Sequence, residues 1–88
     1  MKIFTYALTT GTFVIAAANN VLLLSFKTSS AGSCTMIGTG TYDGQASTAM
    51  TFGASDGLTL TSQNPTSPLD GITITNTGGT VNIIIGVT

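Results

Sequence analysis

Apolar and polar residues alternate along most of this chain, and the polar partner is usually Thr. Leu58 and Leu60 alternate with Thr59 and Thr61, and Ile alternates with Thr over residues 72–75. Side chains along a strand point alternately to the two faces of a sheet, so this pattern predicts strands with one buried face and one face covered by Thr. No segment shows the period of an amphipathic helix.

Turn residues divide the alternating segments into short strands. Gly, Asn, Ser and Pro gather between the apolar runs, and these residues are typical of turns. The eight predicted strands cover residues 3–8, 12–17, 21–28, 33–37, 48–52, 58–62, 72–76 and 80–87. Residues 38–47 are expected to be irregular because of their glycines, and residues 63–71 are expected to form a loop, since Pro65 and Pro68 cannot donate to a sheet. The sequence thus predicts an all-β protein, a single small antiparallel β-sandwich of jelly-roll type that spans residues 1–88 as one domain.

The alternation also separates a candidate core from candidate contact residues. The residues expected to face the core are Leu22, Leu24, Phe26, Met50, Phe52, Leu58, Leu60, Ile72, Ile74, Val81, Ile83, Ile85 and Val87. Leu23 and Ile84 break the pattern because they are apolar on faces that otherwise carry polar side chains. Val14 and the Ala run at 16–18 are expected to form a similar apolar patch. Apolar residues on a solvent face indicate coverage by another molecule. Val14, Leu23 and Ile84 are therefore the candidate interface residues.

Charge and cysteine content favour an assembled protein. Charged residues make up 6% of the chain, with a net charge of −1, whereas about 25% is usual in soluble domains. A low net charge favours association. Cys34 is the only cysteine, so no disulfide stabilises this small domain, and oligomerisation is the remaining common device. We expect a symmetric homo-oligomer, with a trimer favoured. Two lysines are too few for a nucleic-acid surface, and the longest apolar run, 13–18, is too short to cross a membrane.

The chain offers little for catalysis or for holding a cofactor. It contains no His, Arg, Glu or Trp. Cys34 has no His to activate it as a nucleophile, and it is expected to be a small buried hydrophobe. One Cys and no His cannot supply the ligands of a structural zinc site. We expect no catalytic, cofactor-binding or metal-binding residues and no enzymatic activity.

All three acidic residues stand directly before Gly. Asp43, Asp56 and Asp70 are 13 and 14 positions apart and each forms an Asp-Gly pair, which is a strong turn signal. This spacing predicts three separate turns and not a calcium loop, which needs several oxygens within a short segment. Gly57 and Gly79 are expected to have positive φ in their turns.

Four segments between Val21 and Thr88 carry a resemblance to a known class of protein. They are Gly-Thr-Tyr-Asp-Gly at 40–44, Ala-Met-Thr-Phe at 49–52, Asp-Gly-Leu-Thr-Leu at 56–60 and Asp-Gly-Ile-Thr-Ile-Thr-Asn-Thr-Gly-Gly-Thr-Val-Asn-Ile at 70–83. In this pattern the chain resembles the small β-sandwich virion proteins of tailed bacteriophages, which decorate capsids or form head fibres. The resemblance implies a structural virion protein without catalytic residues. It implies a capsid decoration or cement protein that bridges capsid subunits, with the major capsid protein or other virion proteins as partners.

Two other functions are open on the sequence. The first is a carbohydrate-binding or host-attachment module, in which Tyr6 and Tyr42 would stack on a sugar. The second is a secreted bacterial surface subunit, because Met1, Lys2 and the Ala run at 16–18 resemble a signal peptide. Thr-Thr-Gly-Thr at 9–12 interrupts the apolar part of that leader. We expect residues 1–20 to be retained and to form strands that pair with a neighbouring subunit, and we expect the protein to lie in the virion.

Overall fold

The computed structural model describes residues 1–88 as two four-stranded antiparallel sheets packed face to face. One sheet, here the β1 sheet, has the order β1 (Lys2–Leu8), β10 (Val81–Val87), β3 (Val21–Thr28) and β8 (Gly57–Thr61). The other, the β2 sheet, has the order β2 (Thr12–Ile15), β9 (Ile72–Gly78), β4 (Ser33–Ile37) and β7 (Met50–Phe52). The predicted small β-sandwich is confirmed.

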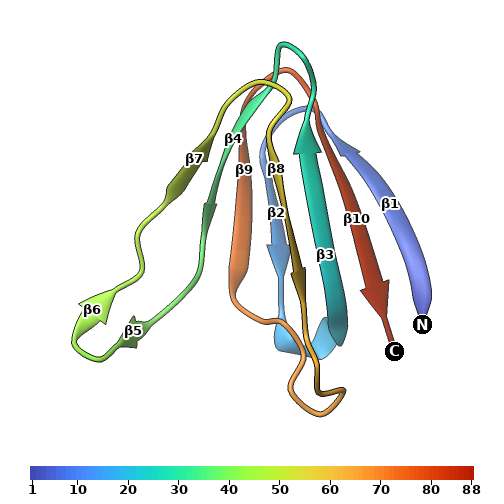
Figure 1. The fold of residues 1–88 in the computed structure, drawn as a ribbon, viewed down its shortest axis with the longest axis vertical. Coiled ribbons are helices and arrows are strands. Elements are labelled where there is room, and N and C mark those ends of the chain that lie inside the picture. The colour runs from blue at the N-terminus through green and yellow to red at the C-terminus, as the bar shows by residue number, and fades with distance from the viewer.

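The chain is one long hairpin that is rolled over on itself. Starting from its tip, β5 (Thr41–Tyr42) pairs with β6 (Gln45–Ala46), then β4 with β7, β3 with β8, β2 with β9 and β1 with β10. Further pairing of β10 with β3 and of β9 with β4 joins these ribbons into the two sheets. This nested pairing is the jelly-roll arrangement that the sequence predicts. It places the two termini side by side, while the β5–β6 hairpin projects from the sandwich as an arm (Figure 1).

Asp43-Gly44 forms a turn, Asp56-Gly57 follows the turn at 54–55, and Asp70-Gly71 lies in the connection before β9. The glycines of these pairs are needed for different reasons. Asp43 and Gly44 have φ values of 51° and 79°, as a two-residue type I′ turn requires at the tip of the arm. Gly79 has a φ of 58°, as expected. The expectation of positive φ at Gly57 is wrong. A Cβ atom at Gly57 would overlap the carbonyl oxygen of Phe26, so the close approach of β3 requires glycine there.

The core lies between the sheets and consists of aliphatic, aromatic and thiol side chains. Its buried members are Ile15, Val21, Leu24, Phe26, Cys34, Phe52, Ile74, Val81, Ile83 and Ile85. Phe26 of the β1 sheet meets Phe52 of the β2 sheet edge to face, with ring centroids 4.9 Å apart. The predicted inward positions of β10 and Phe26 and the predicted burial of Cys34 are confirmed.

Two predicted core positions and several strand ends differ from expectation, and the segment 38–47, which was expected to be irregular, contains the strands β5 and β6. Met50 is 55% exposed, because it begins β7 at the end that leads to the arm. A bulge between β3 and β10 pairs Val21 with Val87, so Val21 is buried and Leu22 is only half-buried. The second strand ends at Ile15, before the 3₁₀ turn η1 (Ala17–Asn19). No helix of the structure has the length and hydropathy to span a membrane.

Candidate interaction surface

Strand β1 is an unprotected edge of its sheet. It pairs with β10 on one side, and no strand pairs with its other side. Apolar side chains are exposed on both of its faces: Ile3 is 55% exposed, Phe4 44% and Tyr6 45%. Edge strands are usually protected by charge, proline or a bulge, and β1 carries only Lys2. Its free backbone groups and apolar side chains can therefore accept another strand.

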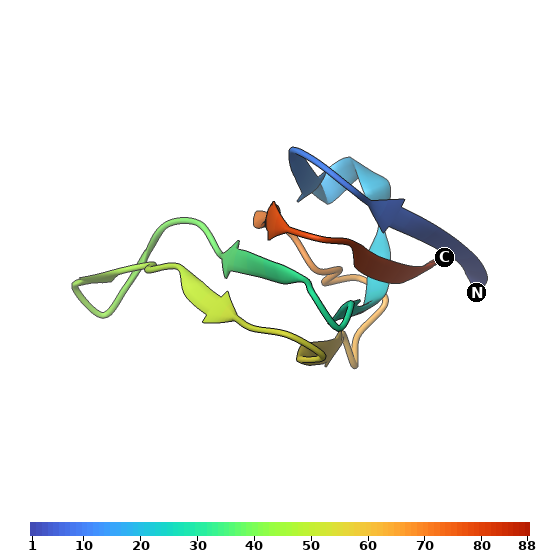
Figure 2. The ribbon, with the colours of Figure 1, turned by 90° about the horizontal axis from the view of Figure 1, so that it is seen from above.

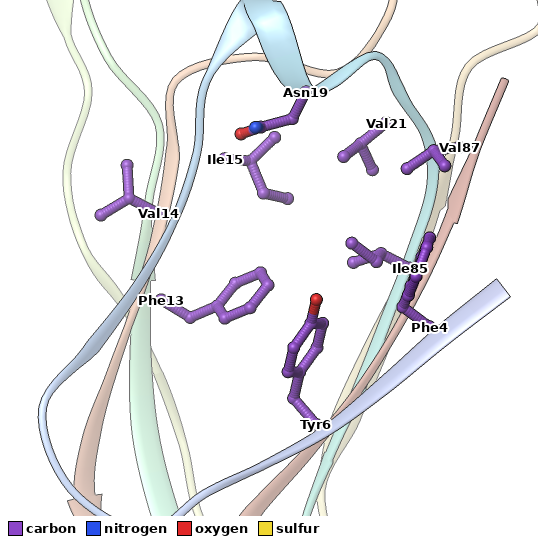
Figure 3. Close-up of a pocket in the computed structure, with 9 residues that line it drawn as sticks. All are labelled: Phe4, Tyr6, Phe13, Val14, Ile15, Asn19, Val21, Ile85 and Val87. Carbon is purple, nitrogen blue, oxygen red and sulfur yellow. The ribbon is translucent and has the colours of Figure 1, made fainter. Parts of the chain in front are cut away.

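Beside β1 the two sheets separate and leave an apolar opening of about 340 Å³, here called the β1–β2 cleft (Figure 3). Its lining residues are Phe4, Tyr6, Phe13, Val14, Ile15, Asn19, Val21, Ile85 and Val87. Tyr6 and Phe13 face each other from opposite sheets, with ring centroids 5.2 Å apart. Asn19 is the one amide in the lining, and its Oδ1 already accepts the backbone N–H of Ala16 at 2.9 Å. The cleft is an opening of the hydrophobic core to the surface.

The outer face of the β1 sheet carries a second apolar group, here called the outer apolar face, formed by Met1, Ile3, Leu23 and Ile84. Ile3 pairs with Gly86, and Gly86 pairs with Leu23, so these residues form one row across the sheet. Ile84 lies on the same face of β10, two residues before Gly86, and it pairs with Thr5 on one side and Ser25 on the other. Its side chain is 41% exposed. The structure thus brings together two of the three predicted interface residues, Leu23 and Ile84.

Val14, the third predicted interface residue, lies on the other sheet. It belongs to β2, is 59% exposed, and points away from the rings of Tyr6 and Phe13 at the rim of the cleft (Figure 3). The sequence pattern indicated neither Ile3 nor Phe4 as a contact residue, and Tyr6 was expected to be one only through stacking on a sugar. A signal was present, since Thr5 is the only polar residue in the run 3–8, which indicates a strand that is apolar on both faces.

The titratable side chains do not form a reactive cluster. Cys34 is fully buried on β4. Burial raises the pKa of its thiol, and the carboxylate of Asp56 adds to the rise, so the thiol stays protonated and is a weak nucleophile. The three Asp residues lie in separate connections between strands, and no three His, Cys, Asp or Glu side chains come together as metal ligands would.

Comparisons with protein-family models, with curated proteins and with solved structures find no match for this chain. Function is therefore inferred from the fold and from the exposed surface.

Proposed function

We propose that this chain is a structural protein of a bacteriophage particle, a capsid decoration or cement protein that stabilises the shell by bridging capsid subunits. The observation that carries the proposal is the apolar surface around β1, on a chain with two basic and three acidic residues. Such a surface binds a partner by burying apolar area. It offers neither the charges that nucleic-acid binding needs nor the reactive groups that catalysis needs. The jelly roll is compatible with this role, because it is used by viral capsid domains as well as by lectins.

The proposed mechanism is mechanical. Copies of a symmetric oligomer bind at equivalent positions of the shell and bury apolar surface against the major capsid protein or another virion protein. Each square ångström of buried apolar surface contributes about 25 cal/mol, so many small contacts add up to a stronger shell. No cofactor takes part, and the site of action is the virion.

A thermal rupture experiment tests this function. Particles with and without the protein are heated at low and at high salt, and release of DNA is followed. We expect particles that lack the protein to assemble but to rupture at lower temperature. The difference should vary little with salt, because few charges are present for salt to screen. Identical rupture curves with and without the protein would rule out the cement role.

A second candidate function is glycan binding during host attachment, and the arm carries the observation that favours it. Tyr42 is 87% exposed and lies next to Asp43 at the tip of the projecting hairpin. An exposed aromatic ring beside a carboxylate is a surface on which a sugar can stack and form hydrogen bonds. Binding to a glycan array that is lost in Tyr42→Ala would favour this function, whereas the cement role requires the surface around β1.

A further inference from the structure

We propose that two copies of this chain pair through β1, antiparallel about a two-fold axis at Thr5, and so join their β1 sheets into one continuous sheet. The proposal concerns the free protein and goes beyond the virion role, because it specifies how the chain associates with itself. Three observations carry it: the open edge of β1, the self-complementary sequence of that strand, and the cleft that a single copy leaves open.

The sequence of β1 is complementary to itself in antiparallel register. With Thr5 on the axis all seven residues of the strand find a partner. Phe4 of one copy then lies opposite Tyr6 of the other on the cleft face, and Ile3 lies opposite Ala7 on the outer face. Directly opposed aromatic side chains stabilise a strand pair. A shift by one residue would turn the aromatic side chains of the second copy away from the cleft of the first. A shift by two residues keeps the faces but pairs only five of the seven residues of the strand, so the register centred on Thr5 is favoured.

The charges also permit this pairing. Lys2 is the only charged side chain in β1. In the antiparallel pair it lies opposite Leu8, and the two lysines stand about 20 Å apart, given the rise of about 3.4 Å per residue. This separation exceeds the Debye length of about 8 Å at physiological salt. A parallel pair would instead place the two lysines side by side.

The second copy completes the cleft. Phe4 and Tyr6 are each nearly half exposed in one copy, and a partner strand beside β1 places its own Tyr6 and Phe4 next to them. The two clefts then form one apolar layer. A strand about 24 Å long on a molecule 18 Å thick gives a contact on the order of 400 Å² per copy. The total is below the roughly 1,000 Å² that a stable specific interface should exceed, so we expect a weak, reversible dimer with a dissociation constant of about micromolar order.

This contact differs from the trimer that the sequence favours. An edge that pairs with its own copy closes at two chains, whereas a trimer needs β1 to pair with a different edge, such as β8. Sedimentation separates the two arrangements, because the first has the mass of two chains and the second the mass of three, and a trimer would overturn the proposed pairing.

A cysteine cross-link tests the register. Directly opposed residues of an antiparallel pair have Cα atoms about 4.5 or 5.5 Å apart, and both distances are within the range of a disulfide. Thr5→Cys should therefore link to itself under mild oxidation and migrate at twice the 8.9 kDa of one chain. The matched control is Thr61→Cys, at an exposed position of the opposite edge strand β8, and it should form no covalent dimer. The native Cys34 is buried in both variants.

Sedimentation completes the test. The unmodified chain should dissociate on dilution, and Thr5→Lys should weaken association at least tenfold because two like charges then stand opposite each other. Thr61→Lys should leave association unchanged. A chain that is monomeric at every concentration, or a cross-link at position 61 and none at position 5, would overturn the proposal. A covalent dimer together with unchanged rupture curves would instead support this pairing and remove the cement role.

Discussion

At the scale of single residues, Thr28 shows how the fold accommodates a buried polar group. It is the one buried polar side chain, 3% exposed. Its hydroxyl donates to the carbonyl oxygen of Gly53 at 2.6 Å and accepts the backbone N–H of Asp56 at 2.9 Å. Burial of a hydroxyl is costly unless its hydrogen bonds are formed. Thr28 thus fixes the turn between β7 and β8 from the end of β3.

Thr28→Val should destabilise the protein. The substitution keeps the shape of the side chain but leaves the Gly53 carbonyl and the Asp56 amide without their partner. We expect the free energy of unfolding to fall by about 1–3 kcal/mol in urea denaturation. Thr61→Val removes a hydroxyl from an exposed position of β8 and should change the same quantity by less than about 0.5 kcal/mol. Equal losses in the two variants would contradict this role of Thr28.

Cys34 predicts a loss of stability in alkali. Burial raises the pKa of its thiol in the folded state above the value of about 8.5 in an unfolded chain. As pH rises past about 8.5, the unfolded chain releases its thiol proton first, and the free energy of unfolding falls by up to about 1.4 kcal/mol per pH unit until the folded thiol also ionises. Below the unfolded pKa this contribution does not vary. Cys34→Ala should lack this part of the slope, and parallel pH profiles of the two proteins would show that the thiol has no such effect.

At the scale of elements, most strands were predicted well because their signals are local. The exposed edge at β1 and the cleft were not predicted, because they depend on contacts between residues far apart in the chain. The predicted ranges 21–28 and 33–37 coincide with β3 and β4, because alternation and turn residues lie within the strands themselves. The exposure of Phe4 and Tyr6 is different in kind. The run 3–8 indicates a strand that is apolar on both faces, but it does not indicate which face is exposed. Phe4 and Tyr6 are exposed because the β2 sheet does not cover β1 completely, and that depends on contacts far apart in the chain. The sequence identified Leu23 and Ile84 because they break the alternation within their own strands. It did not identify the cleft, because the cleft depends on how the two sheets pack.

The pairing of β8 with β3 depends on Gly57, where β8 begins. A Cβ atom there would overlap the Phe26 carbonyl oxygen, so Gly57→Ala must push the two strands apart. We expect a loss of about 1–3 kcal/mol in the free energy of unfolding, the usual range for overpacking. Gly53→Ala is the control, since no atom lies within 4 Å of a Cβ at that position. A thermal melt of Gly57→Ala that matches this control would refute the close approach.

At the scale of the whole molecule, the apolar surface around β1 and the arm with its exposed Tyr42 lie in different parts of the structure. The open edge of β1, the β1–β2 cleft and the outer apolar face all adjoin β1, whereas the arm projects at a distance from that strand (Figure 2). A molecule that docks through the β1 side would therefore leave its arm accessible. The two proposed functions, cement and glycan binding, can be tested separately because they use different parts of the surface.

Ile84→Asp should lower the amount of protein bound to the particle. Ile84 is 41% exposed in the free chain, so the variant should fold. At a contact with the shell it would bury an unpaired charge at a cost of several kcal/mol. Lys27→Ser, an exposed position on the same sheet, is the control and should bind normally. Copy number per purified particle is the measurement, and equal occupancy of the two variants would exclude Ile84 from the contact.

The nested pairing of the strands also determines the order in which the native state can form and open. Strand pairs near the arm close short loops, whereas β1 and β10 join the two ends of the chain, and the entropy cost of closing a loop grows with its length. We therefore expect β1 to join last during folding and to detach first, with the fastest amide hydrogen exchange of the β1 sheet. β10 keeps β3 as a neighbour when β1 leaves. Any partner that pairs with β1 would then slow this exchange, because it binds only the closed state.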